Sequence, residues 1–228
     1  MALMTREISE SAGRFALPVK QTRSRQTRDR LLAAGFKSLR CKQFDELSVA
    51  DIARAAGCAV GSFYLRFVDK DQYFLAIAEM RREQSRALLA SWYEGATRDT
   101  VVAKAVAREL EFVLEHPDFW RAALRKGATD PTFWQEFREL GRESVLRFID
   151  CHERLIGRAL SDEEIERVRF AFQMVRGTVN NTLMNQPGPF QLEDEAFRRQ
   201  LERAFQLVAG IEPAQVRKAL QESGADGG

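Results

Sequence analysis

The chain has 228 residues, of which 45% are hydrophobic and 30% charged, and its formal net charge is +2. This apolar content excludes disorder along the whole chain, and three scattered cysteines exclude a disulfide scaffold and fit a reducing compartment. The sequence contains no run of about 18 apolar residues, so no membrane span is predicted. The N-terminal stretch lacks the apolar core of a secretory signal. We therefore expect a globular, cytoplasmic protein without a membrane anchor.

Positive charge is concentrated near the N-terminus. Residues 1–82 carry 15 Lys and Arg against 9 Asp and Glu, whereas residues 83–228 carry 20 against 24. Within residues 14–42, nine basic side chains accompany a single acid, Asp29. A basic end on a nearly neutral chain is typical of a protein that binds a polyanion, although a solvated arm without a partner would have the same composition. Residues 1–21 are expected to form a disordered basic arm.

Helical patterns dominate the first part of the chain, where apolar residues recur three and four apart. Ser48, followed three residues later by Asp51, predicts the capped start of a short helix, and Gly57 is a typical residue just after its end. Asp69 predicts the start of another helix that runs to about Tyr93. The helices expected in this part cover residues 22–41, 48–57, 59–67 and 69–93.

The remaining sequence is also predicted to be helical. Ser161 and Glu164 repeat the capping pattern, and Asp130-Pro131 is expected to begin a long helix. The helices expected here cover residues 99–115, 118–127, 130–156, 161–185, 193–210 and 213–222. With no alternating strand pattern, the sequence predicts an all-α fold.

Two short helices joined by a tight turn give the strongest signal for function. Ala53 and Ala56 are small enough to let a second helix approach closely, and Phe63 and Phe67, four residues apart, can pack against them. A pair of this kind, with the second helix projecting outward, is how helix–turn–helix proteins enter the major groove of DNA. A helical hairpin inside an ordinary bundle is the alternative.

Residues 47–77, LSVADIARAAGCAVGSFYLRFVDKDQYFLAI, resemble the DNA-binding segment of the TetR (tetracycline-repressor) family of bacterial transcription regulators. The resemblance extends over about residues 22–75. It implies a three-helix DNA-binding head at 22–68 and a helical ligand-binding and dimerisation domain at 69–223. It also implies a homodimeric repressor that binds a double-stranded DNA operator and is released by a small hydrophobic effector, with no cofactor.

Candidate DNA-binding residues lie in and around the second short helix. By the resemblance, Tyr64 and Lys70 match positions that contact phosphates. Val60 and Leu65 can meet the methyl group of thymine, while Arg66 can grip a guanine or a phosphate. The operator is therefore expected to favour A·T steps under this helix. The full set of candidates is Arg25, Arg28, Ser48, Val60, Gly61, Ser62, Tyr64, Leu65, Arg66 and Lys70.

Aromatic residues gather in the segment 112–148. Most aromatics at helical spacing belong to a core, but some are expected to line an apolar cavity between helices, where bundles hold small molecules. The candidate ligand-binding residues are Trp92, Phe112, Trp120, Phe133, Trp134, Phe137 and Gln173.

Two apolar stripes near the C-terminus predict the dimer interface. Gly and Thr permit close helix approach, and an amide inside an apolar stretch needs a hydrogen-bond partner, which a two-fold related copy can supply. Two helices from each subunit would form a four-helix bundle. The candidate interface residues are Phe170, Met174, Gly177, Thr178, Asn181, Phe197, Leu201 and Phe205.

Enzyme chemistry is not indicated. The two histidines, His116 and His152, fall in different helices, and neither a phosphate-binding loop nor a nucleophile motif is present. We therefore expect neither catalysis nor a metal site. Two alternatives remain open: a chromosome-organising DNA-binding protein of the same fold, and a helical enzyme or small-molecule-binding module whose N-terminal hairpin is incidental.

Overall fold

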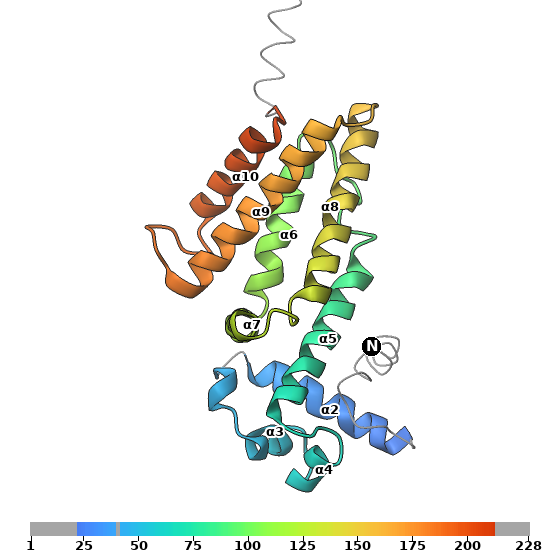
Figure 1. The fold of residues 1–228 in the computed structure, drawn as a ribbon, viewed down its shortest axis with the longest axis vertical. Coiled ribbons are helices and arrows are strands. Elements are labelled where there is room, and N and C mark those ends of the chain that lie inside the picture. The colour runs from blue at the N-terminus through green and yellow to red at the C-terminus, as the bar shows by residue number, and fades with distance from the viewer. Residues whose placement is uncertain (1–21, 40–41, 213–228) are drawn as a thin grey trace, which may run out of the picture. The chain divides into compact units, whose positions relative to one another are not determined.

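The computed structural model describes residues 22–39 and 42–212. The basic arm expected at 1–21 and the helix expected at 213–222 lie outside the described residues. Within the described ranges every regular element is helical, so the predicted all-α class is confirmed (Figure 1). In chain order the elements are α2 (Thr22–Ser38), the 3₁₀ helix η1 (Phe44–Glu46), α3 (Val49–Ala55), α4 (Val60–Tyr64), α5 (Lys70–Leu88), α6 (Val101–Leu114), α7 (Pro117–Thr129), α8 (Gln135–Ile156), α9 (Asp162–Asn185) and α10 (Glu195–Ala209). None of these described helices combines the length and apolarity needed to cross a lipid bilayer.

Both predicted capping boxes are confirmed. The Ser48 hydroxyl accepts the Asp51 amide at 3.0 Å, and the Asp51 carboxylate accepts the Ser48 amide at 3.3 Å. The same reciprocal bonds join Ser161 and Glu164 at the start of α9. Hydrogen bonds from the Arg158 side chain and the Ser161 backbone lower the pKa of Glu164 to about 2, so this cap is ionised at neutral pH.

Two predicted helix boundaries are wrong. The helix expected to open at Asp130 begins at Gln135, because the Asp130 carboxylate accepts both the amide and the hydroxyl of Thr132, at 3.0 and 2.6 Å, and so stabilises a turn. The helix expected to run to Tyr93 ends at Leu88 and is followed by turns.

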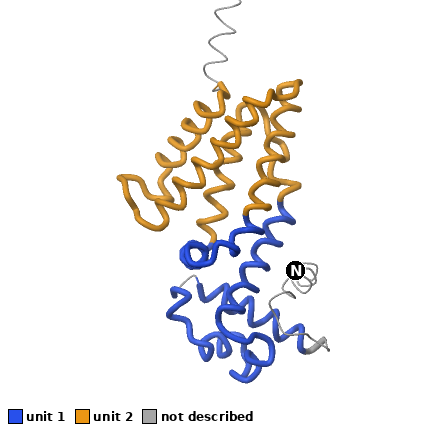
Figure 2. Tube along the Cα trace, viewed as in Figure 1, with its two compact units in different colours: residues 1–88, 116–137 blue, residues 89–115, 138–228 orange. Residues whose placement is uncertain are grey.

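The described chain forms two compact units (Figure 2). Unit 1 comprises the described parts of residues 1–88 and 116–137, and unit 2 those of residues 89–115 and 138–228. The domain boundary expected after residue 68 falls inside unit 1, because α5 packs on α2 and α7 packs on η1.

The core of unit 1 is built around Tyr73. Its ring, fully buried, lies 5.1 Å from that of Phe63 and 5.0 Å from that of Phe67, measured between ring centroids. Its hydroxyl donates to the Leu31 carbonyl at 2.6 Å, and burial raises the pKa of Tyr73 above its usual value. A Cβ at Gly35 would lie 1.7 Å from this hydroxyl, so only glycine fits there. Tyr73 therefore joins α2, α4 and α5.

The core of unit 2 combines an aromatic cluster with a polar bridge. The rings of Phe148, Phe172 and Phe205 meet edge to face, with centroids 5.0–5.3 Å apart. The Arg176 guanidinium donates two hydrogen bonds to the Glu109 carboxylate, at 2.6 and 3.0 Å. This bidentate pair fixes α9 against α6.

Candidate nucleic-acid interface

The turn between α3 and α4 produces the helix–turn–helix. Gly57 ends α3 in a left-handed conformation with φ of +64°, which a side chain would disfavour. The Cys58 amide donates to the Ala53 carbonyl at 3.0 Å, so the chain turns tightly and α4 begins two residues later. Ile52 and Phe63 are completely buried and anchor the two helices to the core of unit 1. The predicted helix–turn–helix is confirmed.

An apolar surface extends along α4 and the residues that follow it. Val60, Tyr64, Leu65 and Val68 are all exposed, and Leu65 has 73% of its area in solvent. Gly61 lies among them, and a Cβ there would meet nothing within 4 Å. We call these five residues the recognition surface. Isolated exposed apolar residues are ordinary, but a cluster of this kind on a projecting helix indicates a partner.

Val68 was not among the residues selected from the sequence. It lies after α4 has ended, where helical spacing no longer predicts which side chains point outward. Ser62, which was selected, is half-buried, and its carbonyl accepts a hydrogen bond from Arg66 at 2.6 Å.

Arg66, expected to contact a base or a phosphate, is instead turned into unit 1. Only 8% of this residue is exposed. Besides its bond to Ser62, it donates from Nε to the Ser24 carbonyl at 3.1 Å and from Nη2 to the Ser24 hydroxyl at 3.2 Å. The guanidinium therefore holds the end of α4 against the first turn of α2, and it positions the recognition surface without belonging to it.

Replacing Arg66 with lysine is expected to weaken DNA binding without changing its salt dependence. Lysine cannot reproduce the planar fork, so we expect a loss of about 1–3 kcal/mol in the free energy of unfolding. Because Arg66 contacts no phosphate in this arrangement, the slope of log affinity against log salt should match that of the wild type. A slope smaller by about 1, with unchanged stability, would place the guanidinium on a phosphate.

Of the two arginines selected on α2, one is turned inward. Arg28 is only 4% exposed, and its Nη2 lies 3.3 Å from the Asp29 carboxylate. The structure therefore places the charge of Arg28 beside an acid and not at the surface. Arg25 is exposed and remains a candidate.

Lys70 and Ser48 occupy helix starts. The Lys70 ammonium donates to the Asp45 carbonyl at 3.1 Å and lies 4.6 Å from the centroid of the Phe44 ring, which orients a half-buried side chain at the beginning of α5. Ser48 is exposed at the beginning of α3, and its hydroxyl and amide lower the pKa of the Asp51 carboxylate by hydrogen bonding. Both remain candidates for phosphate contact.

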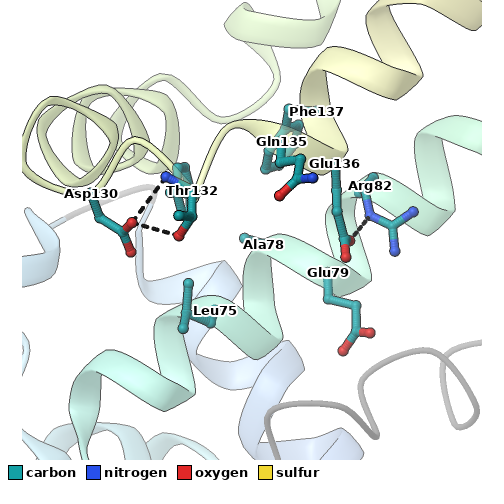
Figure 3. Close-up of a pocket in the computed structure, with 10 residues that line it drawn as sticks. Leu75, Ala78, Glu79, Arg82, Asp130, Thr132, Gln135, Glu136 and Phe137 are labelled. Atoms are coloured by element: carbon teal, nitrogen blue, oxygen red, sulfur yellow. Dashed lines mark hydrogen bonds and ion pairs between the residues drawn. The ribbon is translucent and has the colours of Figure 1, made fainter.

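The predicted ligand residues fall into both units. Phe133 and Phe137 line a cavity of about 170 Å³ in unit 1, between α5 and the segment 130–137 (Figure 3). We call it the α5 cavity. Trp120 and Trp134 belong to the same aromatic cluster, stacked with centroids 6.3 Å apart, and each packs edge to face on Phe137.

The other three ligand candidates belong to unit 2. Gln173 is exposed on α9 and does not line the α5 cavity. Trp92 is half-buried with the Arg108 guanidinium carbon 4.7 Å from its ring centroid, and Phe112 is half-buried on α6. The polar residues of the α5 cavity were missed, although Glu79 and Arg82 stand three apart on one helix and could have been found by that spacing.

The predicted dimer stripe on α9 lies at the surface of unit 2. Phe170 is 58% exposed, and Gly177 and Asn181 are exposed too. Met174 and Thr178 are half-buried. We call these five residues the α9 face.

The predicted stripe on α10 is buried inside unit 2. Phe197, Leu201 and Phe205 are buried in the core of unit 2, because the apolar side of α10 packs on α6 and α9 within the same subunit. Leu207, on another side of α10, is 72% exposed.

Clusters that could support metal chemistry are not found in the described residues, where no three His, Cys, Asp or Glu side chains converge. Cys151 is buried, and burial raises the pKa of its thiol, which makes it a poor nucleophile.

Comparison with known proteins points to the same part of the chain as the helix–turn–helix. Residues 31–77 match the model of a family described as bacterial regulatory proteins, tetR family. Over 81 residues the chain is 32% identical to YwcC, an uncharacterized HTH-type transcriptional regulator of Bacillus subtilis, and the match covers 36% of each protein. The chain thus spans little more than a third of that relative's length.

Two solved structures share the fold. A tetR-family transcriptional regulator from Streptomyces coelicolor has a TM-score of 0.60 at 18% identity, covering 79% of this chain and 81% of that one. FadR from Bacillus subtilis, solved in complex with stearoyl-CoA, has a TM-score of 0.53 at 18% identity, covering 82% of this chain and 98% of that one.

Proposed function

We propose that this chain, which carries the N-terminal domain of the tetR family of bacterial regulatory proteins at residues 31–77, is a sequence-specific, DNA-binding transcriptional repressor of the cytoplasm and not an enzyme. The observation that carries the proposal is the recognition surface on a helix–turn–helix. Its apolar side chains, on α4 and on the residues that follow it, are exposed. Tyr73 packs on Phe63 of α4, and Arg66 ties the end of α4 to α2.

The recognition surface supports a particular kind of operator. Val60, Leu65 and Val68 cannot hydrogen-bond a base, but they can contact the C5-methyl group of thymine. Because Arg66 is hydrogen-bonded inside unit 1, the described residues of the recognition surface include no arginine that could donate to a guanine. The operator should therefore favour A·T steps in each half-site.

Assembly and release complete the proposal. The α9 face exposes the Phe170 ring, and Gly177 on the same face would let a second helix approach closely. A two-fold dimer through this face would present two heads to a palindromic site. A small ligand releases the operator if it binds the DNA-incompetent state more tightly. The complex of FadR with stearoyl-CoA supports a ligand-responsive role for this fold.

Selection of genomic DNA fragments by the purified chain tests the proposal. We expect few fragments, sharing a palindrome whose half-sites lie about 34–36 Å apart or a multiple of this distance. Recovery of many unrelated fragments would favour a chromosome-organising protein. Failure to enrich any sequence would contradict the proposal.

Replacing Gly61 with alanine should separate DNA binding from stability. The added methyl meets no atom of the protein and favours the helix by roughly 0.4–1 kcal/mol, so thermal unfolding should occur at the same or a higher temperature. The methyl would stand between α4 and the groove floor, and we expect operator affinity to fall by about tenfold, or about 1.4 kcal/mol. Fluorescence anisotropy with labelled duplex measures this change. Unchanged affinity would show that α4 does not approach DNA at Gly61.

A further inference from the structure

The lining of the α5 cavity carries more negative than positive charge. Glu79, Asp130 and Glu136 contribute carboxylates, and Arg82 is the one basic residue among the described residues that line it. Arg82 is held by acids: its Nε lies 2.9 Å from the Glu136 carboxylate and its Nη2 lies 2.7 Å from that of Glu83. The guanidinium charge is therefore compensated by two carboxylates within the wall.

Asp130 supplies a fixed anion at one side of the cavity. Figure 3 shows its carboxylate bonded to Thr132, apart from the Arg82–Glu136 pair. These bonds from Thr132 lower the pKa of Asp130, so the group is ionised at neutral pH. The charge of Lys126, whose ammonium lies 3.0 Å from the Asp71 carboxylate, contributes to the same lowering of the Asp130 pKa.

The rest of the lining is apolar and aromatic. Phe133 is nearly buried, and its ring lies 5.8 Å from that of Phe137 and 6.0 Å from that of Phe74, between centroids. Leu75 and Ala78 supply the aliphatic wall on α5. Aromatic rings attract a cation through their negatively charged faces, so these walls and the carboxylates favour the same kind of ligand.

We propose that the α5 cavity binds a small organic cation, a protonated or quaternary amine attached to one compact apolar group. Its volume of about 170 Å³ is below the range of about 300–1,000 Å³ that holds drug-sized ligands. Anions are disfavoured by the carboxylates, and a long acyl chain exceeds the space available.

The cavity lies in the unit that carries the recognition surface. Leu75 and Ala78 belong to α5, the helix whose Tyr73 packs on Phe63 of α4, and the Phe133 ring stacks on Phe74, the neighbour of Tyr73. A ligand that displaces Phe133 would therefore press on the helix that supports α4. The role of this ligand as the effector rests on the proposed function. The binding of the ligand to the α5 cavity does not depend on that function.

Titration calorimetry of the full chain without DNA tests the inference. The probes are benzylammonium, benzyl alcohol and benzoate, which have similar size and differ in charge. We expect benzylammonium to bind at least about tenfold more tightly than either of the others at neutral pH. Equal affinities, a preference for benzoate, or no binding of any probe would overturn the inference.

Variants locate the site. Asp130→Asn and Glu79→Gln should each reduce the preference for benzylammonium, and Ala78→Leu should abolish binding of all three probes by filling the cavity. Glu163→Gln, at an exposed carboxylate of α9, is the control and should keep the wild-type preference. A preference that survives in both Asp130→Asn and Glu79→Gln would overturn the assignment.

Operator binding, measured separately, distinguishes the two proposals. If benzylammonium binds but leaves operator affinity unchanged, the cation site stands and its role as effector site fails. If the operator is bound specifically but benzylammonium is not bound, the proposed function stands and the cation site fails.

Discussion

Phe205→Glu is expected to unfold unit 2, whereas Phe170→Glu is expected to leave the subunit folded and to break the dimer. Phe205 is fully buried among Phe148 and Phe172. Removing a buried phenylalanine side chain costs about 3–5 kcal/mol, and an unpaired buried carboxylate adds to that cost. The sum approaches the total stability of a typical domain, about 5–15 kcal/mol.

Phe170 provides the matched comparison, because the same substitution is made at a site with 58% exposure. A carboxylate there is solvated in the monomer but must be buried against a second copy in the dimer, so it opposes association. Circular dichroism and sedimentation velocity measure the two effects. A folded Phe205→Glu variant, or a dimeric Phe170→Glu variant, would contradict the assignment of these two faces.

Gly35→Ala is expected to destabilise unit 1 although alanine is the better helix former. In an open helix this substitution gains roughly 0.5–1 kcal/mol. Here the new Cβ would come within 1.7 Å of the Tyr73 hydroxyl, so the ring must move and its hydrogen bond to Leu31 is lost. Overpacking costs about 1–3 kcal/mol, and the lost hydrogen bond costs about 1–3 kcal/mol more.

Gly61→Ala is the control for the change in stability. Gly61 also lies in a helix of unit 1, and a Cβ added there would meet nothing within 4 Å. Denaturant unfolding of both variants gives the comparison. We expect Gly35→Ala to lose both stability and operator binding, because Tyr73 supports α4. If the two substitutions have the same effect on stability, Tyr73 does not pack on Gly35 as described.

The helix–turn–helix could be predicted because its signals are local. Ser48 with Asp51, the turn at Gly57 and the spacing of Phe63 and Phe67 lie within twenty residues of one another, and each acts through its immediate neighbours. The predicted start of the long helix, at Asp130, is too early, because an acid followed by a proline can also form a turn. Here the Asp130 side chain accepts the Thr132 amide two residues later and stabilises that turn.

Residues whose roles depend on distant parts of the chain could not be predicted in this way. Arg66 looked like a base reader until its contact with Ser24, 42 residues away, was known. Phe205 belongs to an apolar stripe whose sequence pattern is the same for a dimer interface and for a core. Its contacts with Phe148 and Phe172 place it in the core. The α5 cavity is lined both by Glu79 on α5 and by Asp130 in the turn before α8. These residues are 51 positions apart, so no short sequence spacing predicts that they line one cavity.

We propose above all that the recognition surface binds a specific DNA sequence. The most direct measurement is the affinity of the full chain for a selected genomic duplex and for the same duplex with both half-sites scrambled, each over a range of salt concentrations. We predict a preference of at least about 10³-fold for the intact site, with the affinity for both duplexes falling steeply as the salt concentration rises. Equal affinities for the intact and scrambled duplexes would contradict it.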